Sequence, residues 1–121
     1  MSYDNNNIFA KILREEIPCK KIYEDEFVLS FYDINPQKKI HALVIPKGKY
    51  VDLDDFCSNA KPEEMVGLLK GINIVAKKLG MSVDTGKGYR ALSNISEDGG
   101  QEVPHLHFHL FGGEKIGKMV S

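Results

Sequence analysis

Hydrophobic and polar positions follow two different periods along this chain, and the longest regular stretch has the period of an α-helix. Apolar residues recur at spacings of one and three, and they are Met65, Leu68, Leu69, Ile72, Val75, Ala76 and Leu79. This spacing places them on one stripe of a helix. Pro62 suits the first position of such a helix, and Gly80 suits its end. The pattern therefore predicts a helix over 62–79.

A second, shorter helix is predicted near the N-terminus. Asn7 can cap it through its side-chain oxygen, and Pro18 closes it. The apolar residues at helical spacing are Ile8, Phe9, Ile12 and Leu13. The run before Asn7 is polar, so we expect residues 1–6 to be disordered. Segment 51–61 is acidic and irregular, and it predicts one helical turn at most.

Five runs are rich in β-forming residues and are bounded by proline, glycine or acidic turn residues. They are 21–24, 27–33, 40–45, 88–93 and 105–111. Mostly adjacent, hairpin-linked strands together with one long helix predict an α+β fold with an antiparallel sheet. The short helix and the first hairpin are expected to flank this sheet. No internal repeat or linker is evident, so 1–121 is predicted to be a single domain.

Composition excludes several classes of function. The chain has 121 residues, 42% hydrophobic and 27% charged, which is typical of one globular domain. Its net charge is -1, so binding to nucleic acid or to a membrane surface receives no support from charge. Cys19 and Cys57 are expected to be free thiols. The chain shows neither a signal peptide nor an apolar run of membrane-spanning length, so we expect a cytoplasmic protein.

Three of the four histidines lie in the last predicted strand, which reads His-Leu-His-Phe-His-Leu-Phe. Side chains alternate between the two faces of a strand. His105, His107 and His109 therefore share one face, and the opposite face is expected to be core: Leu106, Phe108 and Leu110. Any polar residue would serve on a solvated strand face, so three alternating histidines indicate chemistry.

The residue pattern alone leaves three interpretations open. Two histidines one residue apart on a strand, with a third ligand, can hold zinc, although neither cysteine has metal-site spacing. Imidazole is also largely neutral near pH 7, so it can act as a nucleophile or a base. The third interpretation is a surface strand that carries histidines without a chemical role.

The pattern His-φ-His-φ-His-φ-φ, where φ is apolar, resembles the signature of the histidine triad family. Further segments resemble its Hint branch, the purine nucleoside phosphoramidases, and together they cover nearly the whole chain: 8–12, 16–18, 31–37, 41–47 and 99–101. The resemblance implies the HIT-like fold, a five-stranded antiparallel sheet with one long and one short helix. It also implies a homodimer in which two such sheets join.

The resemblance assigns a role to each histidine. His107 would attack the α-phosphorus of a nucleotide, and water would then release the nucleoside monophosphate from the phosphohistidine. His109 would donate to phosphate oxygens, and His105 and His41 would lie behind the nucleophile and orient it. The implied activity is hydrolysis of purine nucleoside 5′-phosphoramidates. Cleavage of dinucleoside polyphosphates, nucleotidyl transfer, and nucleotide binding with little turnover are the alternatives.

The resemblance implies a nucleotide pocket and no cofactor. Asp33 matches the carboxylate that binds the ribose hydroxyls, with a turn aspartate as the alternative. Phosphate-loop positions match Asn94, Gly100 and Gln101. Glu102 stands where the Hint branch often has a serine beside the phosphate, so the preferred leaving group stays undetermined. The matching walls of the purine pocket are Ile8, Phe9, Ile12, Ile17, Phe31 and Ile34. Some relatives hold zinc through an N-terminal cysteine pair, and Asn7 and Ala10 stand in its place, so no metal is expected.

Overall fold

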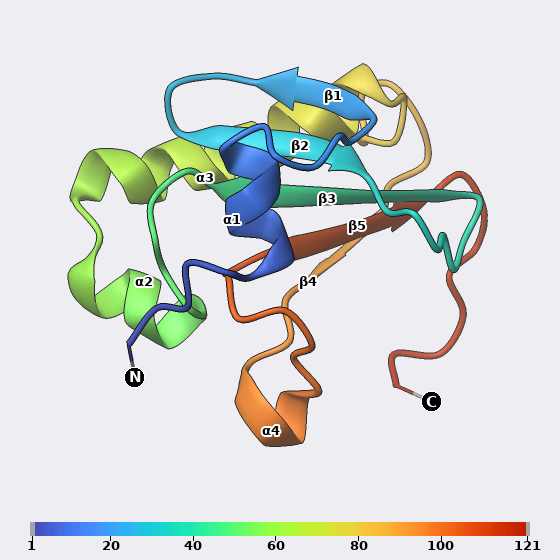
Figure 1. Ribbon diagram of the computed structural model, residues 1–121. Coiled ribbons are helices and arrows are strands. Elements are labelled where there is room, and N and C mark those ends of the chain that lie inside the picture. Colours follow the sequence, from blue (N-terminus) through green and yellow to red (C-terminus); the bar gives the residue numbers. More distant parts are fainter. Residues whose placement is uncertain (1, 121) are drawn as a thin grey trace.

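A computed structural model describes residues 2–120 as a single antiparallel sheet with helices on both faces (Figure 1). Its strands are β1 (Lys21–Glu24), β2 (Val28–Tyr32), β3 (Ile40–Pro46), β4 (Arg90–Leu92) and β5 (Phe108–Gly112). Their order across the sheet is β1-β2-β3-β5-β4. The predicted α+β class and five-stranded antiparallel sheet are confirmed. The expectation that the first hairpin flanks the sheet is wrong, because β1 and β2 pair within it.

Two of the helices were not predicted as helices. The described part of the chain forms four helices: α1 (Ile8–Leu13), α2 (Leu53–Asn59), α3 (Pro62–Lys78) and α4 (Ser96–Gly99). Helix α2 forms within the acidic segment because Asp52 caps it, accepting a hydrogen bond from the Asp55 amide at 2.8 Å, and because Phe56 is buried. None of the helices in residues 2–120 is long and apolar enough to cross a membrane.

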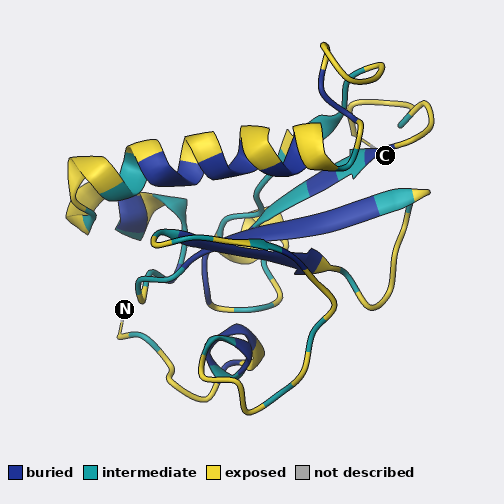
Figure 2. Cartoon of the chain, turned by 90° about the horizontal axis from the view of Figure 1, so that it is seen from above, coloured by how far each residue is buried: buried dark blue, intermediate teal, exposed yellow. Residues whose placement is uncertain are grey.

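Helix α3 covers one face of the sheet with its buried stripe, while its opposite side is exposed (Figure 2). Its predicted bounds are confirmed to within one residue, with Leu79 as the C-cap. Leu69 is the exception on the stripe, since it is 67% exposed. The buried side instead includes Gly67 and Gly71, which allow the helix to approach β2 and its preceding turn closely.

Helix α1 covers the opposite face of the sheet (Figure 2). Its predicted cap is confirmed, because Asn7 Oδ1 accepts from the Ala10 amide at 2.9 Å. The helix ends at Leu13, well before Pro18, because Glu15 turns the chain with a φ of 64°. The hydrophobic cluster between α1 and the sheet contains Phe9, Ile12, Leu29, Phe31, Leu43 and Ile45.

The N-terminal segment follows a defined path, in contrast to the disorder expected for 1–6. Residue 1 lies outside the described residues. Asn7 Nδ2 donates to the Asp4 carbonyl at 2.7 Å, and Arg14 donates to the Asn5 carbonyl at 2.9 Å. Tyr3 packs edge-on against His105, with ring centroids 5.6 Å apart. The segment is therefore tied both to α1 and to the histidine cluster.

Candidate active site

The histidine motif enters the sheet later than expected, since β5 begins at Phe108 rather than at 105. The residues just before it bond to partners outside the ladder: the Leu106 amide donates to the Tyr50 carbonyl, and Ser93 donates to the His107 carbonyl. The alternation of sides still holds, because Leu106 and Leu110 are buried in the core beneath α3.

Two of the three motif histidines are buried, and His109 is half-buried. His105 is 0% and His107 is 5% exposed. Phe9 of α1 lies edge-on to both rings, 6.4 Å from the centroid of His105 and 4.9 Å from that of His107. The motif therefore lies under the N-terminal helix, and the solvated-strand interpretation is wrong.

The fourth histidine joins the same cluster from the neighbouring strand. In the register of β3 and β5, His41 lies opposite Phe111, and Leu43 lies opposite His109. The ring centroid of His109 is 5.1 Å from that of His41 and 5.0 Å from that of His107. Pairing of two strands thus brings together residues that are 68 positions apart in the sequence.

Hydrogen bonds determine where the proton of His107 lies. Its Nδ1 is 2.7 Å from the His105 carbonyl, which can only accept, so Nδ1 carries the proton and Nε2 keeps its lone pair. Burial lowers the pKa of His107, so the ring is neutral at pH 7. In residues 2–120 no buried side-chain nitrogen or oxygen lacks a partner. The unpartnered Nε2 therefore reaches the solvent-accessible surface, as a nucleophile requires.

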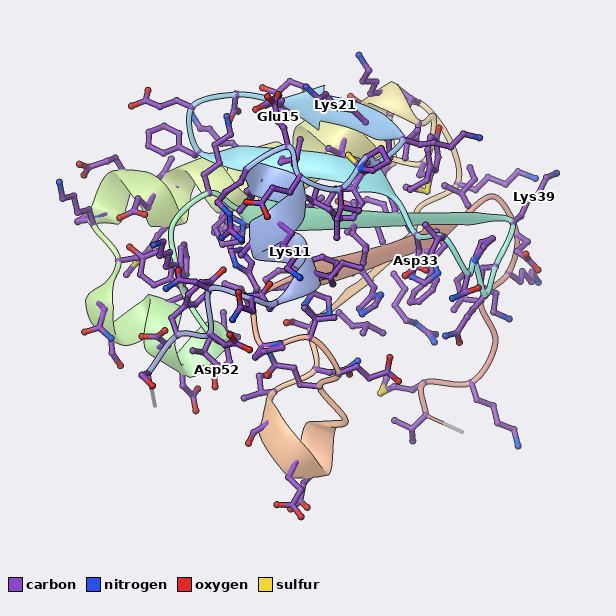
Figure 3. All side chains as sticks on the ribbon, viewed as in Figure 1. Lys11, Glu15, Lys21, Asp33, Lys39 and Asp52 are labelled. Carbon is purple, nitrogen blue, oxygen red and sulfur yellow. The ribbon has the colours of Figure 1, made fainter. Side chains whose placement is uncertain are left out.

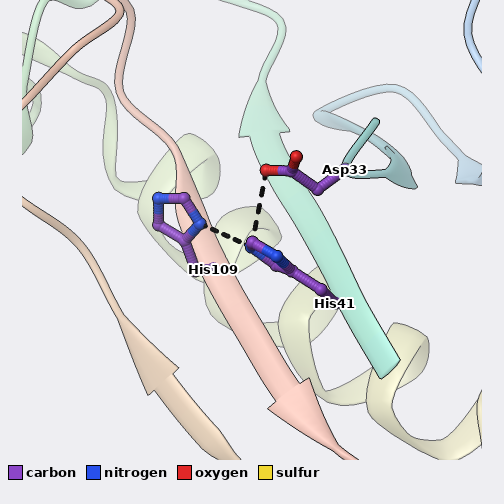
Figure 4. Close-up of side chains that lie close together, drawn as sticks. All are labelled: Asp33, His41 and His109. Atoms are coloured by element: carbon purple, nitrogen blue, oxygen red, sulfur yellow. Dashed lines mark hydrogen bonds and ion pairs between the residues drawn. The ribbon is translucent and has the colours of Figure 1, made fainter. Parts of the chain in front are cut away.

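The same reasoning makes His109 a donor (Figure 4). The Gln37 amide donates to His41 Nδ1 at 3.2 Å, so His41 carries its proton on Nε2. This proton is donated to His109 Nδ1 at 2.9 Å. His109 then carries its own proton on Nε2. Burial, with His107 and His41 nearby, lowers the pKa of His109 to about 4.

His105 is the most deeply buried of the four. Its Nε2 donates to the Pro46 carbonyl at 2.9 Å, and its Nδ1 lies 2.5 Å from the Tyr3 hydroxyl. Burial lowers its pKa to about 4. The sequence interpretation missed Tyr3, and the signal for it was one aromatic residue within a polar tail.

His105 and His41 support two different residues, whereas the expected arrangement placed both behind the nucleophile. His105 supports His107 through its backbone carbonyl. His41 instead contacts His109, at the outer end of the motif. Each of the two outward-facing nitrogens therefore has a support of its own.

Among residues 2–120, one group of side chains could hold a metal ion, and it differs from the zinc set considered from the sequence. Asp33, His41 and His109 each offer one atom, and these atoms all lie within 4.8 Å of one another. His41 Nε2 is 3.5 Å from Asp33 Oδ2. However, the Gln37 amide makes Nε2 the protonated nitrogen of His41. A metal would have to displace that proton, so the observed bonds fit neutral histidines better than a metal site.

Asp33 lies directly after β2, at the start of the loop that ends at Lys39, just before β3 (Figure 3). Its Oδ1 accepts from the Asn35 amide at 2.8 Å, so it is a turn aspartate. Its Oδ2 faces His41. Asp33 is therefore a turn residue through Oδ1 and adjoins the histidine cluster through Oδ2, while its expected contact with ribose stays a prediction.

The expected purine-pocket residues separate into exposed and buried members. Ile34 is 84% and Ile8 is 41% exposed, so both offer surface to a ligand. The others belong to the core beneath α1, where Ile17 is half-buried and three are buried: Phe9, Ile12 and Phe31. The structure therefore packs four of the six into the core beneath α1 and leaves Ile8 and Ile34 exposed.

The expected phosphate-loop residues surround α4. Gly100 ends that helix with a φ of 75°. Gln101 Nε2 donates to the carbonyls of Val51 and Val103, and its Oε1 accepts from the Ser96 amide. The side-chain amide of Gln101 is therefore occupied within the loop. Glu102 is exposed, and its charge acts on His107, partly opposing the lowering of that pKa.

A groove of about 780 Å³ opens beside His109. Asn94 and Phe111 line it, and its charged lining residues are three cations, Lys38, Arg90 and Lys118, and one acid, Asp98. Arg90 donates to the carbonyls of Gly117 and Lys118 and thereby fastens the C-terminal tail along the groove. His109 thus lines a wide groove in which cationic side chains outnumber acidic ones.

Comparison with known proteins gives one consistent result. Residues 14–116 match the family model of the HIT domain. An HIT-like protein of Azospirillum brasilense is 53% identical over 120 residues, covering 99% of this chain and 96% of its own. A HIT family hydrolase of Clostridium thermocellum has a TM-score of 0.85 at 36% identity, covering 98% and 99%. A histidine triad protein of Clostridium difficile has a TM-score of 0.81 at 39% identity, covering 97% and 98%. The chain belongs to the HIT family.

Proposed function

We propose that this protein hydrolyses purine nucleoside 5′-phosphoramidates through a covalent intermediate on His107. The observation that carries the proposal is the pair of outward nitrogens, a lone pair on His107 Nε2 beside a proton on His109 Nε2. A nucleophile next to a hydrogen-bond donor suits attack on a phosphoryl group whose oxygens carry negative charge. A structural relative described as a HIT family hydrolase supports the reaction class.

The reaction proceeds in two displacements. His107 Nε2 attacks the α-phosphorus, the phosphorus–nitrogen bond breaks, and the amine leaves after taking a proton from solvent. His109 donates its Nε2 proton as a hydrogen bond to a phosphoryl oxygen throughout. Water then attacks the phosphorus, which restores His107 and releases the nucleoside monophosphate. Asp33 Oδ2 accepts hydrogen bonds from the ribose hydroxyls. The exposed side chains of Ile34 and Ile8 contact the base.

The test uses an alkylamine phosphoramidate of AMP and follows release of the amine. His107→Ala should abolish turnover, and a brief incubation of wild type should leave AMP bound to His107. Cys57→Ala is the control, because Cys57 is an exposed thiol outside the cluster and should be dispensable. Equal turnover by wild type and His107→Ala would rule out the proposal.

The charge of the groove favours a second candidate substrate class, the dinucleoside polyphosphates. Lys38, Arg90 and Lys118 line the space beside His109, and an anionic leaving group would interact favourably with them. Parallel assays with an AMP phosphoramidate and a diadenosine polyphosphate separate the two classes. A higher kcat/KM for the polyphosphate would make it the preferred substrate.

The proposal extends to a cytoplasmic homodimer without a cofactor. Strand β4 is an edge strand, and α3 exposes Val66 and Leu69, which provides a sheet edge and an apolar surface for a second copy. The free thiols Cys19 and Cys57 suit a reducing compartment. Light scattering during size-exclusion chromatography should give twice the chain mass.

A further inference from the structure

Tyr3 lies at the inner end of a hydrogen-bonded series that reaches His107. Its hydroxyl is 2.5 Å from His105 Nδ1, His105 Nε2 is 2.9 Å from the Pro46 carbonyl, and the His105 carbonyl is 2.7 Å from His107 Nδ1. The Pro46 carbonyl can only accept, so the proton of neutral His105 lies on Nε2. His105 Nδ1 is then an acceptor, and the Tyr3 hydroxyl must be its donor.

Burial keeps both partners in these protonation states. It lowers the pKa of His105 to about 4 and raises the pKa of the Tyr3 hydroxyl above its ordinary value. At neutral pH the tyrosine is therefore a hydroxyl that can donate, and the imidazole is a neutral ring that can accept. Both ring nitrogens of His105 have one partner each.

The position of Tyr3 is set by more than this one bond. The next four residues are tied to α1, because Asn7 donates to the Asp4 carbonyl and Arg14 donates to the Asn5 carbonyl. Phe9, in the first turn of α1, packs edge-on against His105 and His107. The N-terminal segment and α1 thus cover the same two imidazoles from neighbouring positions.

We propose that Tyr3 is a positioning residue for the nucleophile: its hydroxyl fixes the ring of His105, whose carbonyl in turn fixes the protonated Nδ1 of His107. This inference rests on the proposed function, in which Nε2 of His107 attacks phosphorus. Without the hydroxyl, His105 has one anchor instead of two, and the carbonyl that orients His107 is held less firmly. The reacting nitrogen then spends less time aligned with the phosphorus.

The kinetic test compares Tyr3→Phe with wild type. Tyr3→Phe keeps the ring that packs on His105 and removes only the hydroxyl, so kcat should fall by about tenfold to a hundredfold, the size expected for a misplaced reacting group. KM should stay the same, since Tyr3 lies behind the histidines and away from the substrate. Tyr23→Phe is the matched control, because the Tyr23 hydroxyl also makes one side-chain hydrogen bond, to Asp25, and β1 is remote from the cluster.

Two outcomes separate this proposal from the proposed function. A wild-type kcat in Tyr3→Phe, with His107→Ala inactive, would overturn the role of Tyr3 and leave the function standing. If His107→Ala is as active as wild type, the function itself fails.

Nitrogen-15 NMR of the wild-type imidazoles gives a measurement that needs no variant or substrate. His105 should be protonated on Nε2 only, and the Tyr3 hydroxyl proton should be visible and close to that ring. Protonation on Nδ1 would overturn the proposal.

Discussion

Nε2 of His41 lies 2.9 Å from Nδ1 of His109, so the histidine outside the motif determines the tautomer of the last histidine within it. The tautomer of His41 is set in turn by the Gln37 amide, which donates a hydrogen bond to His41 Nδ1 and so leaves the ring proton on Nε2. A backbone group of the loop before β3 is thereby connected to His109, which lines the groove. His41 itself is buried and does not need to touch substrate.

His41→Phe should therefore impair catalysis indirectly. Phenylalanine retains an aromatic ring against Phe111 and removes the donor to His109, which can then place its proton on either nitrogen. We expect kcat to fall about tenfold, and His109→Ala to cost about a hundredfold, as for loss of a donor to a developing charge. Single-turnover rates of nucleotide transfer to His107 measure both. Lys39→Ala, at an exposed loop position, is the control. A larger loss in His41→Phe than in His109→Ala would contradict this order.

The buried histidines should make stability depend on pH between about 6.5 and 4. The folded-state pKa values of His105 and His109 are lowered to about 4, so over this interval the unfolded chain binds protons that the folded chain does not. Stability is then complete above pH 6.5 and is lost as the pH falls toward 4. The slope for one such group is about 1.4 kcal/mol per pH unit.

Urea unfolding at several pH values between 7 and 4.5 measures this dependence. The range near pH 6 is the informative one, because carboxylates titrate mainly at lower pH. The pKa of Glu24, for example, is lowered to about 2 by its hydrogen bonds to Lys21 and Lys47. His109→Gln removes one of the imidazoles and should give a shallower slope than wild type. A free energy of unfolding that is constant from pH 7 to pH 5 would disprove the assignment.

Much of the fold followed from local patterns. The stripe from Met65 to Leu79 predicted α3 because its spacing matched a helix, and Pro62 and Gly80 marked its ends. The five strands were also found where β-forming runs stood between breakers. Helix α2 was missed because its apolar face consists mainly of Leu53 and Phe56, so the helix depends on the Asp52 cap and tertiary burial rather than on a periodic stripe.

The sequence predicted which histidines form the site, but it did not predict how they contact one another. The alternating histidines and the resemblance named the four residues that the structure gathers. Their pairing depends on the register of β3 against β5, which places Leu43 opposite His109, and no local pattern encodes that. Tyr3 was missed for the same reason, since its partner His105 lies 102 residues away.

Gln101 offers a test between its expected contact with phosphate and its observed place in the loop. Its side chain bonds to Val51, Val103 and Ser96, so Gln101→Met should leave partly buried polar groups without partners. We expect a loss of about 1–2 kcal/mol in unfolding free energy together with reduced activity. Glu97→Gln, on the exposed side of α4, is the control. Reduced activity at unchanged stability would indicate direct contact with substrate instead.

Gly67→Ala should destabilise the protein, although glycine is normally the poorer residue inside a helix. In an open helix the change would gain about 1 kcal/mol. Here a methyl group at Gly67 would lie 2.5 Å from Cγ of Phe27, close to the backbone end of that side chain, where it cannot swing away. Overpacking of this kind costs about 1–3 kcal/mol, so the clash outweighs the gain in helix propensity.

Chemical denaturation of Gly67→Ala and of Asn73→Ala measures the balance on one helix. Asn73 lies on the exposed side of α3, where alanine improves helix propensity without meeting a neighbour, so that variant should be slightly more stable than wild type. The two substitutions should therefore shift the midpoint in opposite directions. If both stabilise, α3 does not approach β2 and its preceding turn as closely as the glycines indicate. That close approach is what covers Leu106 and Leu110, the core-facing residues of the histidine motif.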